Sequence, residues 1–66
     1  MEILLNGVDR ELAQGATIAE LVSELELVGR RVAVEVNGRI VPASKHGEYP
    51  LGDGDRVELI SAIGGG

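Results

Sequence analysis

Three consecutive glycines, Gly64, Gly65 and Gly66, follow an apolar segment and place a carboxylate at the C-terminus. A carboxylate is a poor electrophile, so it reacts only after activation, for example as an acyl-adenylate made by a separate enzyme. Because glycine has no Cβ, such a tail can enter a narrow active site and approach a nucleotide closely. It also leaves the acyl carbon open to a sulfur or nitrogen nucleophile. A frayed end or a remnant of cloning would have the same composition, and the tail alone does not decide between these readings.

The other candidate groups form no recognisable catalytic, phosphate-binding or metal-binding motif. His46 is the single histidine, cysteine is absent and the serines lie in no catalytic motif, so no nucleophile with a positioned base is expected. Asp53 and Asp55 are similar to a fragment of a calcium loop, but an EF-hand loop needs ligands over twelve positions, and we interpret them as a turn. No Walker-type loop is present. We therefore expect no catalytic residue, no metal and no bound cofactor, and predict that the chain is not an enzyme.

The composition of the 66 residues also limits the partners. A net charge of −5 and a pI near 4.6 argue against nucleic acid, which requires a basic surface. The acidic surface favours a partner with a basic docking face, or it serves only solubility. Neither a signal segment nor a membrane-spanning apolar run is evident, so we expect a cytoplasmic protein without a membrane partner. A chain this short forms one domain without a deep pocket.

Sequence patterns predict a hairpin and a helix in the first half of the chain. Residues 1–5 and 8–12 flank Asn6-Gly7, a pair typical of type I′ hairpin turns. Thr17 and Glu20 form a capping box, and apolar residues then recur with helical spacing. We predict a helix over residues 18–28, with Gly29 as the C′ residue that ends it.

Sequence patterns predict three strands in the second half of the chain. Alternating valines mark residues 32–36, Asn37-Gly38 is a second hairpin turn, and a short strand follows over 39–41. Residues 43–49 are polar and irregular, and they could include one helical turn. The last strand is expected over 56–63. One amphipathic helix must cover one face of the resulting sheet, which leaves the other face open.

The open face is a candidate docking surface. Leu4, Ala33, Ile60 and Ala62 are assigned to it alongside several glutamates. Apolar residues on an open face can mark a partner site or be ordinary scattered surface residues. Because Ile60 and Ala62 lead into the glycines, we select them, with Leu4, as docking residues. Arg30-Arg31 is either a docking pair or a solvated cap at the helix end.

The complete chain resembles the ThiS family, the sulfur carriers of thiamin biosynthesis. The resemblance rests on the length and on the segments Met1–Gly7, Val34–Pro42, Asp53–Ile60 and Ala62–Gly66. It implies an α+β fold of the ubiquitin-like β-grasp type, with a mixed four- to five-stranded sheet and one main helix on one face. Residues 1–63 would form this domain, and residues 64–66 a flexible tail. Family members often carry a tryptophan near the position of Lys45-His46-Gly47; its loss puts the packing of that loop in doubt, but not the tail chemistry.

The resemblance also implies a mechanism and partners. An adenylating (E1-like) enzyme would use ATP to activate the carboxylate of Gly66, and sulfur from a relay that includes a cysteine desulfurase would convert it to a thiocarboxylate. Thiazole synthase would receive the sulfur. Gly64 and Gly65 would be the threading arm. The open alternatives are a carrier of the molybdopterin synthase small-subunit type, a ubiquitin-like modifier whose Gly66 joins lysines, and an interaction module with an inert tail.

Overall fold

The computed structural model describes residues 1–27 and 29–61. Over these residues the chain forms five strands, one α-helix and one 3₁₀ helix. In chain order they are β1 (Glu2–Leu5), β2 (Val8–Glu11), α1 (Ile18–Glu24), β3 (Val32–Val36), β4 (Arg39–Val41), η1 (Ala43–Glu48) and β5 (Arg56–Ser61). The predicted order of the strands and of the α-helix is therefore confirmed. The segment expected to be irregular, with one helical turn as an option, instead forms the six-residue 3₁₀ helix η1.

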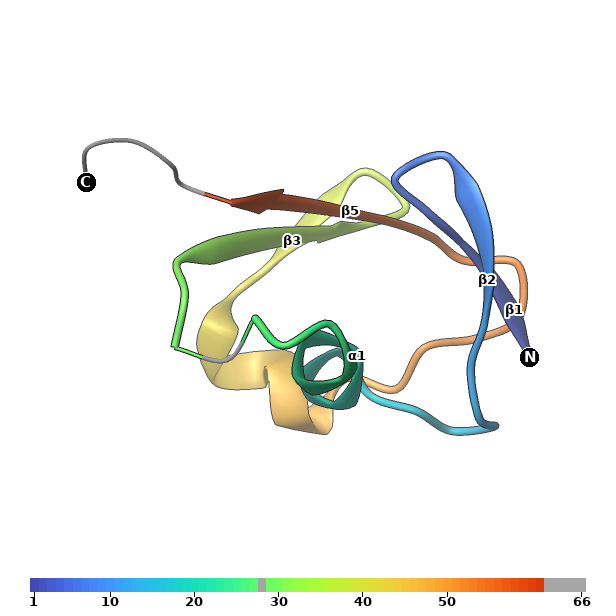
Figure 1. Ribbon diagram of the computed structural model, residues 1–66, viewed down its shortest axis with the longest axis horizontal. Coiled ribbons are helices and arrows are strands. Elements are labelled where there is room, and N and C mark those ends of the chain that lie inside the picture. The colour runs from blue at the N-terminus through green and yellow to red at the C-terminus, as the bar shows by residue number, and fades with distance from the viewer. Residues whose placement is uncertain (28, 62–66) are drawn as a thin grey trace.

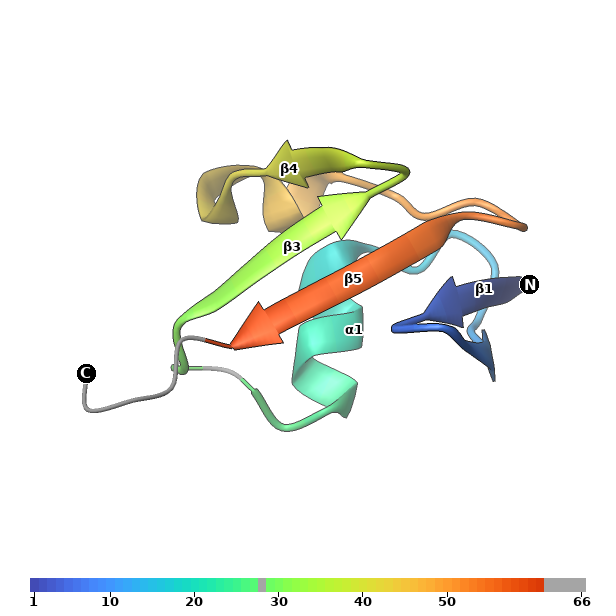
Figure 2. The same cartoon turned by 90° about the horizontal axis from the view of Figure 1, so that it is seen from above.

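The strands form one mixed sheet in the order β2-β1-β5-β3-β4. β1 pairs antiparallel with β2 and parallel with β5, and β3 pairs antiparallel with both β5 and β4. β5, the last strand in sequence, thus lies at the centre of the sheet (Figure 2). A central strand has neighbours on both sides, so its direction is fixed by two ladders.

Both helices lie on the same side of the sheet, and the opposite face carries none in the described part of the chain (Figure 1). The core between sheet and helices is wholly apolar. Its buried members are Ile3, Leu12, Ala16, Ile18, Leu21, Val34, Val36, Val41, Leu51 and Val57. Backbone hydrogen bonds from Ile18 to Tyr49 O (3.1 Å) and from Leu51 to Ala16 O (2.8 Å) fasten the start of α1 to the segment after η1.

The start of α1 matches the predicted capping box. The Thr17 hydroxyl accepts a hydrogen bond from the Glu20 amide (3.2 Å), and the Glu20 carboxylate accepts one from the Thr17 amide (2.9 Å). Two amides that lack partners inside the helix are thereby satisfied.

The end of α1 differs from the prediction. The helix stops at Glu24, with Leu25 as its C-cap, and Glu26 adopts a left-handed φ of 58°. Leu27 N donates to Val22 O and Glu26 N to Ser23 O, each at 3.0 Å. These two bonds define a Schellman motif in which Glu26, not Gly29, is the C′ residue. The prediction was wrong because it relied on the preference for glycine at C′, and the first glycine after the helical pattern, Gly29, lies three residues beyond the actual C′ residue, Glu26.

This conformation yields a stability prediction at Glu26. A left-handed residue with a Cβ costs about 1–2 kcal/mol over glycine, and part of that is offset by the greater unfolded-state entropy of glycine. Glu26→Gly should therefore raise the free energy of unfolding by about 0.5–1 kcal/mol, measured by urea denaturation. Glu26→Ala is the matched control, since it removes the same charge and keeps the Cβ. An equal gain from both variants would mean that charge, not backbone strain, is the cause.

The last strand begins at Arg56 as predicted and extends through Ser61. Val57 is fully buried and Leu59 packs against the core, whereas Ile60 is 52% exposed. The predicted assignment of these residues to opposite faces is confirmed. Ile63, the predicted last residue of the strand, lies outside the described residues.

Candidate functional site

The candidate reactive group follows strand β5. Gly64, Gly65 and Gly66, together with the docking candidate Ala62, lie outside the described residues. The described structure ends at Ser61, which pairs with Val32 at the start of β3. The described structure therefore shows strand β5, which precedes the tail, and the surface beside the end of that strand.

Two asparagines, which the sequence predicted only as turn residues, also hold β5 in place. Asn6 and Asn37 have positive φ values of 49° and 52°, as their hairpin turns require. The side-chain oxygen of Asn6 accepts a hydrogen bond from Leu59 N (2.9 Å), and that of Asn37 accepts one from Arg56 N (3.0 Å). On the β1 side, where only Leu4 and Leu5 pair with β5, Asn6 extends the ladder by one bond. The turns thus fix the strand that leads to the tail.

Asp53 and Asp55 stabilise the turn before β5, as expected. The Asp53 carboxylate accepts a hydrogen bond from Glu2 N (2.8 Å). The Asp55 carboxylate accepts bonds from Gly52 N (2.8 Å) and from the Asn37 side chain (3.0 Å). Within residues 1–27 and 29–61, no group of His, Asp and Glu side chains is arranged to hold a metal ion.

His46 has a structural contact. It is half-buried in η1, and its Nε2 lies 3.0 Å from Val41 O. Because a carbonyl oxygen only accepts, Nε2 carries the proton in this contact.

No helix in the described part of the chain is long and apolar enough to cross a membrane.

The open face carries two of the docking candidates at separate places. Ile60 on β5 stands opposite Ala33 on β3. Leu4 on β1 is half-buried and stands opposite Arg56, the first residue of β5. Arg56 and Ile60 are four steps apart along the extended strand, or about 13 Å. The exposed Glu58 lies between them on the same face. Leu4 and Ile60 therefore share a face but not one continuous apolar patch, and Ile60 is the one beside the end of β5.

Arg30 and Arg31 lie next to that end. They precede β3, and with Val32, Ala33, Ala43 and Ile60 they line a shallow groove of about 550 Å³. Both side chains are exposed, and the ion pair found among the described residues, Arg10 with Glu24 at 3.3 Å, involves neither of them. Because α1 ends at Glu24, Arg30 and Arg31 lie too far along the chain to cap the last turn of this helix, which was one of the two roles predicted for them.

Comparison with known proteins identifies the family. The sequence profile of the ThiS family matches residues 3–66. This chain belongs to the ThiS family of thiamin-biosynthesis sulfur carriers. It is 33% identical to the sulfur carrier protein ThiS of Escherichia coli, over the full length of both chains. It is also 39% identical to a thiazole synthase of Paramagnetospirillum magneticum, where it matches only 20% of that protein's length.

A solved structure confirms the β-grasp fold of this ThiS-family chain. The crystal structure of the thiamine biosynthesis protein ThiS from Geobacter metallireducens superimposes with a TM-score of 0.84 at 30% identity, and both chains are covered completely. The predicted α+β class, with a mixed sheet and one main helix on one face, is therefore correct.

Proposed function

We propose that this protein carries sulfur for thiamin biosynthesis as a thiocarboxylate on Gly66. An adenylating enzyme activates the carboxylate with ATP, so that AMP becomes the leaving group. Sulfur supplied by a relay that starts from a cysteine desulfurase displaces AMP, and thiazole synthase accepts the sulfur. The carrier supplies no catalytic residue and binds no cofactor in this scheme, which we place in the cytoplasm.

The match of the family profile through residue 66 is the observation that carries this proposal. The fold supports it, because β5 is paired with β3 through Ser61 and is held on its other side by β1 and the Asn6 side chain as far as Leu59. A fixed strand followed by residues without side chains suits a group that must enter the active site of another enzyme.

Thiazole synthase is the proposed acceptor because two relatives bear that name. The chain spans about a fifth of the length of the thiazole synthases of Paramagnetospirillum magneticum and Magnetococcus marinus (20% of each). In those proteins a segment similar to this carrier is part of the same polypeptide. Such a fusion keeps the carrier segment and the synthase at a high effective concentration, which is useful if the two act on each other directly. This supports a direct interaction between the present carrier and a separate thiazole synthase.

Reconstitution tests the proposal. The carrier is incubated with the adenylating enzyme, cysteine desulfurase and thiazole synthase of its own organism, with ATP, cysteine and the carbon substrates of the synthase. Thiazole product should form only when the carrier is present, in an amount that rises with carrier concentration. Covalent attachment to lysines of other proteins without thiazole product would instead identify a modifier. Sulfur transfer to a molybdopterin precursor alone would identify the sibling type of carrier.

A further inference from the structure

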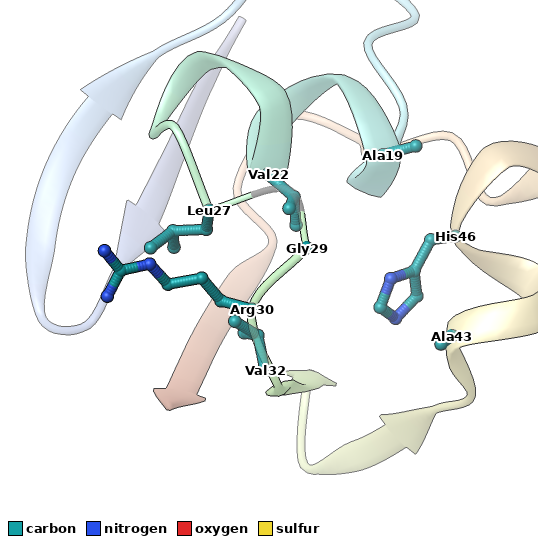
Figure 3. Close-up of a pocket in the computed structure, with 8 residues that line it drawn as sticks. All are labelled: Ala19, Val22, Leu27, Gly29, Arg30, Val32, Ala43 and His46. Carbon is teal, nitrogen blue, oxygen red and sulfur yellow. The ribbon is translucent and has the colours of Figure 1, made fainter. Parts of the chain in front are cut away.

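A small apolar pocket lies beside the groove at the end of β5 and has no part in the proposed sulfur chemistry. It opens between α1, η1 and the start of β3 (Figure 3). Its lining consists of Ala19, Val22, Leu27, Gly29, Arg30, Val32, Ala43 and His46. The guanidinium of Arg30 points away from His46 in Figure 3, so the side chain lines the pocket with its methylenes and leaves its charge at the rim.

The size of this pocket suits one large side chain. Its volume is about 260 Å³, larger than a cavity of about 150 Å³ that holds benzene. It is smaller than most pockets for drug-sized ligands, which begin at about 300 Å³. Aromatic residues are the side chains that most often anchor a protein partner in such a pocket.

The pocket and the groove form one surface. Arg30, Val32 and Ala43 line both of them. The groove continues to Ile60, the docking candidate beside the end of β5. A chain segment lying in the groove would therefore contact Ile60 and reach the pocket with a side chain.

The charge at this surface is opposite to that of the whole molecule. The protein has a net charge of −5 and six basic residues, of which Arg30 and Arg31 form the one adjacent pair. Both line the groove, so an acidic segment is attracted there and repelled by much of the remaining surface.

We infer that the groove and pocket together bind an acidic segment of a partner protein, with one aromatic side chain of that segment in the pocket. The carboxylates of the segment meet Arg30 and Arg31, and its backbone passes over Ile60. The inference deepens the proposed function by giving the chemistry of the partner's docking segment. It adds the pocket to the predicted interface and places Arg30 and Arg31, one of whose predicted roles was docking, beside Ile60.

A peptide with one tryptophan flanked by two aspartates on each side is the probe. The protein contains no tryptophan, so indole fluorescence reports on the peptide alone, and amide shifts in NMR spectra locate the site. We expect a Kd below about 1 mM, shifts at Ala19, Val22, Ala43 and His46, and weaker binding as salt is raised. Shifts elsewhere, no binding, or equal binding of a lysine-flanked peptide would overturn the inference.

Matched variants separate charge from shape. Arg30→Glu with Arg31→Glu should weaken peptide binding about tenfold or more, and Arg39→Glu with Arg56→Glu less than about twofold. Ala19→Leu should fill the pocket and weaken binding similarly, whereas Ala13→Leu in the exposed loop should not. Equal effects within either pair would contradict the proposed site.

Thermal unfolding verifies that each variant is folded before its binding is interpreted. Failure to bind the peptide, with normal sulfur loading of Gly66, would overturn this inference alone. Absence of sulfur loading, with normal peptide binding, would overturn the proposed function alone.

Discussion

Ile60→Glu is expected to lower kcat/KM for adenylation of the carrier at least about tenfold, because a charge would replace an apolar contact at the proposed docking surface. The side chain of Ile60 is 52% exposed, so the substitution removes little from the core. The free energy of unfolding should fall by no more than about 1 kcal/mol, the range of strand propensities. Initial rates of pyrophosphate release at several carrier concentrations measure the effect.

Ile40→Glu is the matched control for this prediction. Ile40 is 62% exposed. It lies on β4, the strand at the edge of the sheet, and stands opposite Glu35 on β3. Its substitution makes the same chemical change away from the end of β5, and adenylation should change less than about twofold. Equal losses in both variants would show that overall charge, not the surface around Ile60, governs recognition.

Leu21→Ala should have the largest effect on stability. Leu21 is fully buried in α1, and truncation of a buried leucine costs about 2–5 kcal/mol because a cavity remains. Domains of this size rarely hold more than about 3–5 kcal/mol in their core. A substantial fraction of the molecules should therefore be unfolded at 25 °C, as measured by urea denaturation followed by circular dichroism.

Val8→Ala is the companion to Leu21→Ala. Val8 is 69% exposed on strand β2, and its truncation should change the free energy of unfolding by less than about 0.5 kcal/mol. If Leu21→Ala were equally mild, the packing of α1 against the sheet would not be the main source of stability.

The sequence predicts this fold well where the signals are local. The Thr17 and Glu20 capping box, the two Asn-Gly turns and the alternation along β5 each involve residues a few positions apart, and each is found in the structure. The end of α1 was mispredicted because propensity favours glycine at C′, and Glu26 adopts the left-handed conformation against that preference. Local preference can be overridden when the surrounding structure compensates for the cost.

The surface beside the tail was predicted only in part. The exposure of Ile60 follows from strand alternation. The bond between Asn6 and Leu59 joins residues 53 positions apart, and the groove that brings Arg31 to Ile60 depends on the pairing of β3 with β5. A single sequence gives no register between distant strands, so these relations needed the structure.

The intact mass of the protein is the most direct test of the central claim that Gly66 carries the sulfur. The protein is incubated with its adenylating enzyme, ATP and a sulfur source, and its mass is then measured. We expect the mass to increase by the difference between one sulfur and one oxygen. Fragmentation should locate this increase on Gly66, and deletion of Gly65 and Gly66 should abolish it. An unchanged mass, under conditions in which the same enzyme loads another ThiS-family carrier, would contradict it.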